Sequence, residues 1–320
     1  MEITSNFSNI WFSILALAGG ILLLVAGGET LISGAVKLAG RLGMSSLLIG
    51  LTVVAFGTSM PELFVSLNAT LQNHPDIMIG NVIGSNIANI GLVLALSALL
   101  SPLAIHFSRI AKELYLVLLA SLLLFGITWT GVFNRIFGLL FVAAIIAYTV
   151  SSYHREVREK KNNEAPRKEA SDSHSYTSII SFIIAGLLLL AFGSNLFING
   201  AVDVARHFGV SELVIGLTLA AVGTSLPELA SCISAIRRRE SDILVGNIVG
   251  SNLFNLLLVM GGTAIVVPFD LPSHLLRRDL PAMLLFSAFL VPVLYRTHRL
   301  QRHHGAILLA GYIIYLYLLI

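Results

Sequence analysis

The sequence predicts an all-α membrane protein of about ten transmembrane helices, arranged as two inverted five-helix repeats. Three observations support this prediction. The chain of 320 residues is 56% hydrophobic and only 12% charged, its apolar residues gather in long runs, and a large part of its first half recurs in its second half. Soluble domains carry about twice that share of charged residues. The composition therefore excludes an ordinary soluble fold.

Each apolar run is long enough to cross a hydrocarbon core of about 30 Å. We expect spans at residues 11–38, 46–71, 78–100, 109–129 and 132–152, and, after a charged gap, at 177–205, 211–236, 243–267, 275–294 and 305–320. The first run is too long for the apolar region of a signal peptide, so we expect it to be retained. The predicted domains are a first repeat at 1–152, a cytoplasmic linker at 153–176 and an inverted second repeat at 177–320.

The basic residues predict the orientation of these spans. With the linker placed in the cytoplasm, the loops on that side hold 16 of the Lys and Arg residues, and those on the other side hold 4. Because cytoplasmic loops are enriched in Lys and Arg, we expect both termini on the extracytoplasmic side. The same enrichment explains the net charge of +3 without nucleic acid. We expect the lipid bilayer as a partner and no obligatory protein partner.

An internal repeat relates the two halves. An offset of 166 residues aligns them without a gap from Gly34 and Gly200 to Glu113 and Asp279. Within it, GLTVVAFGTSMPEL at 50–63 matches GLTLAAVGTSLPEL at 216–229 at 10 of 14 positions, and IGNVIGSNIANIGLVL at 79–94 matches VGNIVGSNLFNLLLVM at 245–260 at 8 of 16. Five spans per repeat is an odd number, so the second repeat enters the membrane upside down. Such repeats are typical of secondary transporters with a substrate site at the midplane.

The GTSMPE and GTSLPE motifs place a proline and a carboxylate inside an apolar span. Pro61 and Pro227 have no N–H group, so in each motif the carbonyl four residues earlier loses its helical partner and the helix kinks. The carbonyl groups at 55–58 and 221–224 then become available to a cation. Each motif also has three oxygen-bearing side chains on one helix face: Thr58, Ser59 and Glu62 in the first, and Thr224, Ser225 and Glu228 in the second.

The spans that follow add two polar positions each. Ser85 and Asn89 lie four residues apart on one helix face, and Ser251 and Asn255 repeat this spacing. The motifs together predict a ring of carboxylate, hydroxyl, amide and carbonyl oxygens, which are the ligands of a hard cation such as Ca²⁺. Two carboxylates in a dry site repel each other, so the ring needs cations or protons to compensate its charge.

These doubled motifs resemble the two alpha repeats of the calcium/cation antiporter superfamily, in particular its prokaryotic sodium/calcium exchangers. The resemblance covers nearly the whole chain. It implies exchange of Na⁺ for Ca²⁺ by alternating access in a prokaryotic plasma (inner) membrane, with both ions bound as substrates and no cofactor. In that family the Ca²⁺ site is built from the two motif glutamates and nearby threonine carbonyls, which map to Glu62, Glu228, Thr58 and Thr224.

The family's Na⁺ sites add hydroxyl groups and two backbone carbonyls, which map to Ser59, Ser225, Ser85, Ser251, Ala55 and Ala221. The polar positions at the centre fall on Asn89 and Asn255. Some members carry Asp at one of them, and in potassium-dependent relatives an acidic residue there is tied to K⁺ transport. Two asparagines therefore argue against K⁺ co-transport and leave two charges in the site.

Alternative functions differ in how far the sequence excludes them. An H⁺-driven antiporter of Ca²⁺ or another divalent cation stays open, although the four serines favour Na⁺. An intramembrane hydrolase is disfavoured, because all nine histidines fall in predicted loops or span ends and a nucleophilic serine needs a nearby base. A cation channel would also use oxygen ligands, but channels usually gather a filter around a symmetry axis.

Two isolated residues receive local interpretations. Glu29 lies in the first span, but its repeat counterpart is Asn195, so we predict a local pairing with a basic group near the cytoplasmic end and not a role in ion entry. Cys232 is the only cysteine, which excludes a disulfide within the chain.

Overall fold

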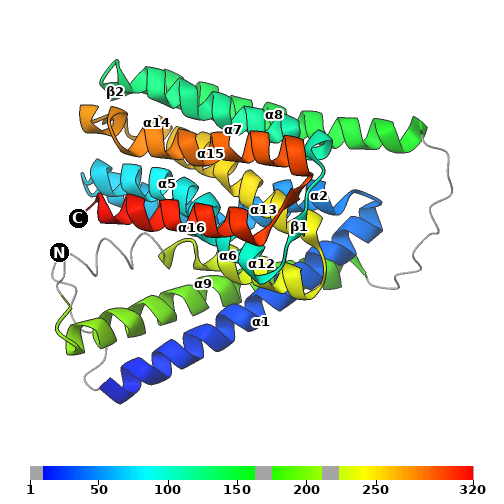
Figure 1. The fold of residues 1–320 in the computed structure, drawn as a ribbon, viewed down its shortest axis with the longest axis horizontal. Helices are drawn as coiled ribbons and strands as arrows, with labels where there is room; N and C mark the ends of the chain where they lie inside the picture. The colour runs from blue at the N-terminus through cyan, green and yellow to red at the C-terminus, as the bar shows by residue number, and fades with distance from the viewer. Residues whose placement is uncertain (1–9, 163–174, 211–222, 320) are drawn as a thin grey trace.

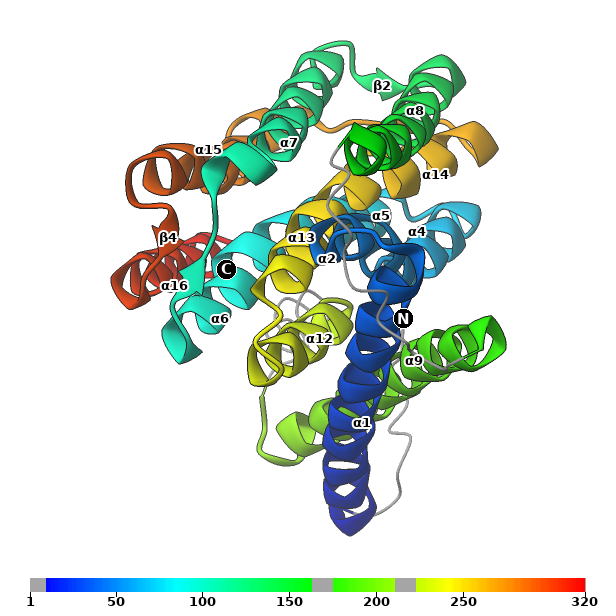
Figure 2. The same cartoon turned by 90° about the vertical axis from the view of Figure 1, so that its right-hand side faces the viewer.

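The computed structural model describes residues 10–162, 175–210 and 223–319. It is a bundle of long helices that run side by side, with α1 (Ile10–Leu42) and α9 (Tyr176–His207) as a pair along one flank (Figure 1). The view along the bundle shows α12 beside this pair (Figure 2), and α12 contacts both α1 and α9.

The first repeat contains two broken spans between continuous helices. After α1 come α2 (Ser46–Ile49), π-helical η1 (Gly50–Val54), α3 (Ala55–Thr58), α4 (Met60–Leu71), α5 (Pro75–Ala88), π-helical η2 (Asn89–Leu94), α6 (Ala95–Leu100), α7 (Phe107–Thr128) and α8 (Arg135–Asn162). The second repeat has the same order where it is described. After α9 come α12 (Leu226–Arg237), α13 (Ser241–Leu253), π-helical η4 (Phe254–Met260), α14 (Gly261–Val266), the 3₁₀ turn η5 (Ser273–Leu276), α15 (Asp279–Thr297) and α16 (Arg302–Tyr317).

The helices agree with the predicted spans. Eight of them, among the described residues, are long and apolar enough to cross a membrane. The predicted span 211–236 includes α12, but its residues 211–222 lie outside the described part of the chain. The last predicted span corresponds to α16, a helix of 16 residues. Most ends agree with the prediction to within a few residues.

The helix of the fifth span is longer than the predicted span. We expected the fifth span to end at residue 152 and a linker to follow, but α8 continues to Asn162. Residues 153–162 include several Glu, Arg and Lys residues and no Gly or Pro, so their intrinsic preference favours continuation of the helix. The rest of the predicted linker, 163–174, lies outside the described residues.

Glycines let α1 and α9 approach each other closely. A Cβ atom at Gly27 would lie 2.8 Å from the backbone nitrogen of Leu190, and one at Gly186 would lie 2.5 Å from that of Leu31. These glycines belong to two rows that the 166-residue offset relates: Gly20, Gly27 and Gly34 on α1, and Gly186, Gly193 and Gly200 on α9. Small residues of this kind are typical of tightly packed membrane helices.

The centre of the bundle is α13, in which every residue from Ile243 to Leu253 is buried. Gly246 and Gly250 face the second span, since a Cβ atom at either would lie less than 3 Å from backbone atoms of that span. Because α13 packs on η1 and α3 of the other repeat, the two repeats meet along this helix.

Two short antiparallel ribbons join the repeats. β1 (Leu103–Ala104) pairs with β4 (Arg299–Leu300), and β2 (Val132–Phe133) pairs with β3 (Phe269–Asp270). Each ribbon therefore takes one strand from each repeat. Figure 1 shows β1 and β2 toward opposite ends of the bundle, as an inverted repeat requires.

Candidate functional site

In both proline motifs a non-helical serine lies directly before the helix that carries the motif glutamate. Ser59, with φ −81° and ψ −1°, separates α3 from α4. Ser225, with φ −86° and ψ 2°, precedes α12 in the same conformation. The break predicted in the first motif is therefore confirmed, whereas residues 211–222, which precede the second motif, lie outside the described part of the chain. The kinks place each motif glutamate in the first turn of its helix, where the helix dipole favours a negative charge.

Glu62 and Glu228 form the electrostatic centre of the site. Both side chains are fully buried, with 0% of their surface exposed. Neither carboxylate oxygen of Glu62 has a hydrogen-bond partner among the described residues, and the Thr58 and Ser251 hydroxyl groups interact with the Glu228 carboxylate without forming a well-aligned hydrogen bond. The two carboxylates also repel each other. Burying a carboxylate without a partner is very costly, so this pair is built to receive positive charge.

Further buried polar groups without partners lie in the same motifs. They belong to four predicted site residues, and are the hydroxyl oxygens of Ser59 and Ser225, the amide oxygen of Asn89, and both amide atoms of Asn255. Native proteins leave few buried polar atoms unpaired. Together with the carboxylates, these groups supply the oxygen ligands that a hard cation prefers.

Hydroxyl groups of the two repeats meet in pairs. The hydroxyl oxygen of Thr58 lies 3.2 Å from that of Ser251, and the hydroxyl oxygen of Ser85 lies 3.4 Å from that of Thr224. The 166-residue offset relates these two contacts to each other. The structure therefore brings together four of the predicted site residues, two from each repeat.

The central asparagines lie where α-helix changes to π-helix. Asn89 begins η2, and Asn255 lies within η4. The amide nitrogen of Asn89 donates to the amide oxygen of Asn252, at 3.0 Å. Single π-helical turns are rare and frequent at functional sites. The periodicity of the sequence did not predict these π-helical turns, because a π-helical turn is wider than an α-helical one and rotates the residues after it relative to an ideal α-helix.

The backbone carbonyls of the motifs have different environments. The carbonyl oxygen of Gly223, which Pro227 releases, accepts a hydrogen bond of 2.7 Å from Ser194 on α9. The carbonyl of Ala55 accepts from the N–H of Ser59, at 3.0 Å, and is also within 3.4 Å of the Thr58 hydroxyl. Ala221, the other predicted carbonyl ligand, lies outside the described residues.

Sequence reasoning missed two asparagines, Asn81 and Asn247. The hydroxyl of Thr224 donates to Asn81, at 3.2 Å, and that of Thr58 donates to Asn247, at 3.1 Å. Each asparagine therefore binds the threonine of the other repeat. Their signal was present, because both lie in the doubled GN(V/I)(I/V)GSN segment at the 166-residue offset, but we considered only the later polar positions of that segment.

A cavity of about 430 Å³ lies between α9 and the two kinks. Its walls include Thr58, Thr224 and both motif prolines, together with apolar residues of α9 and the polar side chains of Ser194 and Asn195. The cavity thus adjoins a motif threonine of each repeat.

Glu29 pairs with basic groups, as predicted. Its carboxylate oxygens lie 3.3 Å from a guanidinium nitrogen of Arg237 and 3.0 Å from that of Arg238. These arginines end α12 and follow it. The pair ties α1 to α12 outside the candidate site.

Elsewhere in the described part of the chain, no group of three or more His, Cys, Asp and Glu side chains could hold a metal ion. The candidate site has two carboxylates among neutral oxygens. This composition suits a cation that is bound and released, because fewer charges hold a hard cation less tightly.

Comparisons with known proteins agree with this geometry. The sequence pattern of the family described as Sodium/calcium exchanger protein matches residues 12–154 and 178–320. The chain is 35% identical over 306 residues to inner membrane protein YrbG of Escherichia coli strain K12, with 94% of each chain covered. It is 30% identical over 357 residues to sodium/calcium exchanger MaX1 of Methanosarcina acetivorans, with 99% of each covered. A solved structure of the sodium-calcium exchanger NCX_Mj, soaked with zero Na⁺ and Ca²⁺, superposes with a TM-score of 0.83 at 29% identity, covering 98% of this chain and 100% of that one.

The fold and the site together define an integral membrane antiporter for cations, built from two inverted repeats. Because the family pattern matches both repeats, the chain belongs to the sodium/calcium exchanger protein family.

Proposed function

We propose that this protein exchanges Na⁺ for Ca²⁺ across the membrane by alternating access at the oxygen site between its repeats. The observation that carries the proposal is the pair of fully buried glutamates, Glu62 and Glu228, whose four carboxylate oxygens accept no well-aligned hydrogen bond from the described residues. One Ca²⁺ balances the two carboxylates, and so do two Na⁺. The same site can then serve both ions in turn.

The remaining residues have proposed roles around this pair. The carbonyl groups of Thr58 and Thr224 complete the Ca²⁺ ligands, and Asn89 with Asn255 supplies neutral amide groups at the centre. Na⁺ takes the serine hydroxyls and the two alanine carbonyls: Ser59, Ser225, Ser85, Ser251, Ala55 and Ala221. The serine hydroxyls that are unpartnered and buried, those of Ser59 and Ser225, support this part of the proposal.

The charge of the site explains why one ion would not cross the membrane without a counter-ion. Two uncompensated carboxylates in a dry, closed site repel each other strongly, so the empty site resists the change of access. The loaded site is neutral and can change access. Ca²⁺ uptake that continues unchanged without counter-ions on the other side would contradict this coupling rule.

The test is uptake of radioactive Ca²⁺ into proteoliposomes loaded with Na⁺ or with choline, with and without an imposed pH gradient. We expect uptake that requires internal Na⁺, is insensitive to the pH gradient, and is lost in Glu62→Gln. Uptake without Na⁺, driven by internal acid, would overturn Na⁺ coupling and the assignment of the serines as Na⁺ ligands.

The alternative is antiport of H⁺ against Ca²⁺ or another divalent cation. Its support is the interaction between the two carboxylates, since such a pair can exchange a cation for protons. The chain is also 26% identical over 293 residues to the Ca²⁺/H⁺ antiporter ChaA of Bacillus subtilis, with 83% of this chain covered. The pH-gradient arm of the uptake experiment separates the two couplings.

We also propose that the protein lies in a prokaryotic inner membrane with both termini outside the cytoplasm. The 16 to 4 distribution of Lys and Arg supports this orientation. A cysteine placed at His74 should then react with a membrane-impermeant maleimide in intact cells, and one placed at Arg239 should not. The native Cys232 is buried and gives little background. The reverse labelling pattern would invert the orientation.

A further inference from the structure

Two directed chains of hydrogen bonds connect the repeats next to the carboxylates. In one, the hydroxyl of Thr58 donates to the Asn247 amide oxygen, at 3.1 Å, and the Asn247 amide nitrogen donates to the Ser231 hydroxyl, at 2.9 Å. The Ser231 hydroxyl in turn donates to the backbone carbonyl of Glu228, at 2.9 Å. The chain begins at the motif threonine of the first repeat and ends at the motif glutamate of the second.

The second chain runs in the opposite sense. The hydroxyl of Thr224 donates to the amide oxygen of Asn81, at 3.2 Å. The amide nitrogen of Asn81 donates to the backbone carbonyl of Glu62, at 3.1 Å, and to the Ser66 hydroxyl, at 2.9 Å. This chain begins at the motif threonine of the second repeat and ends at the motif glutamate of the first. The two chains are thus related by the inverted repeat, although their last links differ.

The orientation of both amides is fixed by the acceptors that surround each amide nitrogen. An asparagine amide has a donor end and an acceptor end. The donor end of Asn247 faces the Ser231 hydroxyl and the Cys232 sulfur, which lies 3.8 Å away. The donor end of Asn81 faces the oxygens of its own repeat. In each case the acceptor end must therefore face the threonine of the other repeat.

This orientation controls how the threonine hydroxyls are used. A hydroxyl has one proton and two lone pairs. The asparagine oxygen is the nearest acceptor of each threonine hydroxyl: it lies 3.1 Å from Thr58, against 3.2 Å for the Ser251 hydroxyl and 3.4 Å for the Ala55 carbonyl, and 3.2 Å from Thr224, against 3.4 Å for the Ser85 hydroxyl. A threonine that gives its proton to the asparagine keeps its lone pairs available as acceptors, which is what a cation ligand needs. Without the asparagine the hydroxyl is free to rotate and to donate its proton to a neighbouring oxygen.

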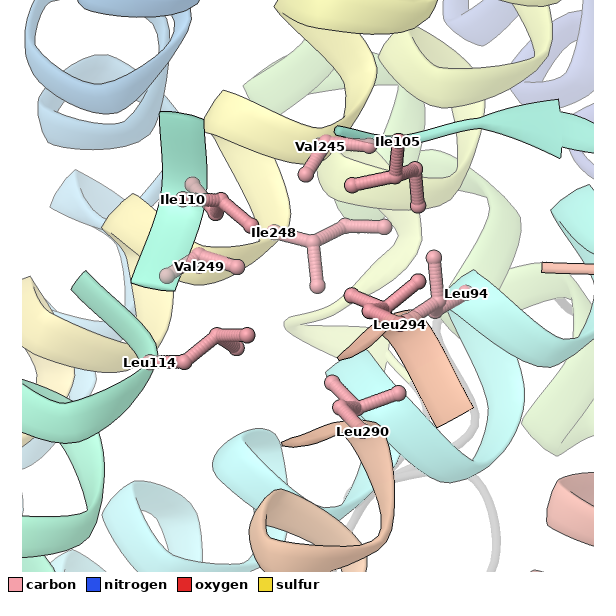
Figure 3. A pocket seen from close by; sticks show the side chains of 9 residues that line it. All are labelled: Leu94, Ile105, Ile110, Leu114, Val245, Ile248, Val249, Leu290 and Leu294. Atoms are coloured by element: carbon pink, nitrogen blue, oxygen red, sulfur yellow. The ribbon is translucent and has the colours of Figure 1, made fainter. Parts of the chain in front are cut away.

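Another part of the surface of α13 packs against apolar side chains. Val245, Ile248 and Val249 of α13 lie among aliphatic side chains of α7, α15 and the third span (Figure 3). These neighbours line a small apolar cavity with no polar side chain in its walls. Asn247 and Ser251 thus occupy the polar side of a helix whose other side is held in apolar packing.

We propose that Asn81 and Asn247 are positioning residues, each of which holds the motif threonine of the opposite repeat with its hydroxyl lone pairs toward the transported cation, so that the hydroxyl is a ligand in addition to the backbone carbonyl. The proposal rests on the proposed function, since it concerns the same site. Groups that orient metal ligands often matter nearly as much as the ligands, and their loss typically lowers metal affinity by about 10- to 100-fold.

Double-mutant cycles test this arrangement, because the structure gives each asparagine one threonine and not the other. The matched pairs are Asn247→Ala with Thr58→Val, and Asn81→Ala with Thr224→Val. The mismatched pairs, Asn247→Ala with Thr224→Val and Asn81→Ala with Thr58→Val, are the internal controls. The readout is the Ca²⁺ concentration that gives half-maximal uptake, under whichever ion gradient drives wild-type uptake.

We expect each single variant to raise this concentration by about tenfold or more. A matched double variant should have the same half-saturating Ca²⁺ concentration as the more severe of its two single variants. The asparagine acts through the threonine hydroxyl, which the threonine substitution has already removed. A mismatched double variant should show the product of the two single effects. Matched pairs that multiply like mismatched pairs, or asparagine variants that lower only the maximal rate, would overturn the proposal.

A substitute variant covers loss of folding, and wild-type uptake separates the two proposals. If an alanine variant is not recovered in folded form, Asn247→Ser or Asn81→Ser enters the same cycle, because a small polar side chain limits the cost to the neighbouring hydroxyl. A wild-type protein that takes up no Ca²⁺ under any gradient contradicts the proposed function. Wild-type uptake with multiplicative matched pairs contradicts only the positioning role.

Discussion

Ser194 on α9 donates a hydrogen bond of 2.7 Å to the carbonyl oxygen of Gly223. That carbonyl lies four residues before Pro227, which has no N–H group to offer it. A side chain from another helix therefore replaces the missing backbone donor. The repeat counterpart of Ser194 is Gly28, which has no side chain to do the same for the first motif. The two kinks are thus supported differently by α1 and α9.

Replacement of Ser194 by alanine should destabilise the protein. The change leaves a buried carbonyl without its partner, and such a group costs about 1–3 kcal/mol. Thermal unfolding in detergent is the measurement. Ser181→Ala is the matched control, since Ser181 lies on the same helix, is exposed, and its hydroxyl donates to the carbonyl of Thr177 within that helix. An equal loss of Tm in both variants would contradict the role of Ser194.

Ca²⁺ should raise the Tm of the wild-type protein but not that of Glu62→Gln or Glu228→Gln. A ligand at about 100 times its Kd stabilises the folded state by about 2.7 kcal/mol, and loss of one of two carboxylates removes half of the charge that holds the ion. Asp76→Asn, at an exposed carboxylate outside the site, should keep the full Ca²⁺ effect. An undiminished Ca²⁺ effect in both glutamine variants would place the site elsewhere.

The glycine contacts of α1 should tolerate no side chain. Gly27→Ala would place a methyl group 2.8 Å from the backbone of Leu190, so we expect a lower Tm and reduced Ca²⁺ uptake. Gly40→Ala is the control on the same helix, because its Cβ would meet no described atom within 4 Å. It should be neutral or slightly stabilising, by up to about 1 kcal/mol. Normal stability of Gly27→Ala would mean that the two helices can separate without loss.

The ion pair of Glu29 should contribute little to stability and nothing to ion selectivity. Its carboxylate is 28% exposed and the arginines are more exposed still, and pairs of this kind are worth about 0–1 kcal/mol. Glu29→Gln should therefore lower Tm slightly, less so at high salt, and leave the half-saturating Ca²⁺ concentration unchanged. A marked change in Ca²⁺ dependence would implicate Glu29 in ion entry.

Asn255→Asp should make Ca²⁺ affinity more dependent on pH. The new carboxyl is neutral when protonated at low pH and adds a third negative charge when it ionises, so Ca²⁺ affinity should rise with pH across its titration. The half-saturating Ca²⁺ concentration at several pH values is the measurement. Asn68→Asp, on the exposed side of α4, should follow the wild-type profile. Identical profiles for wild type and Asn255→Asp would remove Asn255 from the site.

The sequence predicted the helices and the motif side chains because both depend on local patterns. Length and apolarity define a span, and a proline without an N–H group defines a kink. Thr58 and Ser251 are separated by 193 residues. Their hydroxyl contact depends on how the repeats pack, and the 166-residue repeat was the one feature of the sequence that indicated it. Asn81 and Asn247 carried the same offset and continue the four-residue spacing of the later polar positions on the same helix face, but we considered only those later positions. The π-helical turn that begins at Asn89 has no local sequence signal that we could use.

The two ribbons make the interface between the repeats self-complementary. Each half presents a strand at one face of the bundle and receives one at the other, as two subunits of a two-fold symmetric dimer would. A single five-helix chain that inserted in both orientations would close the same two ribbons between separate molecules. Joining two such chains end to end would preserve these contacts, and the two halves can then differ at equivalent positions, as they do at Gly28 and Ser194.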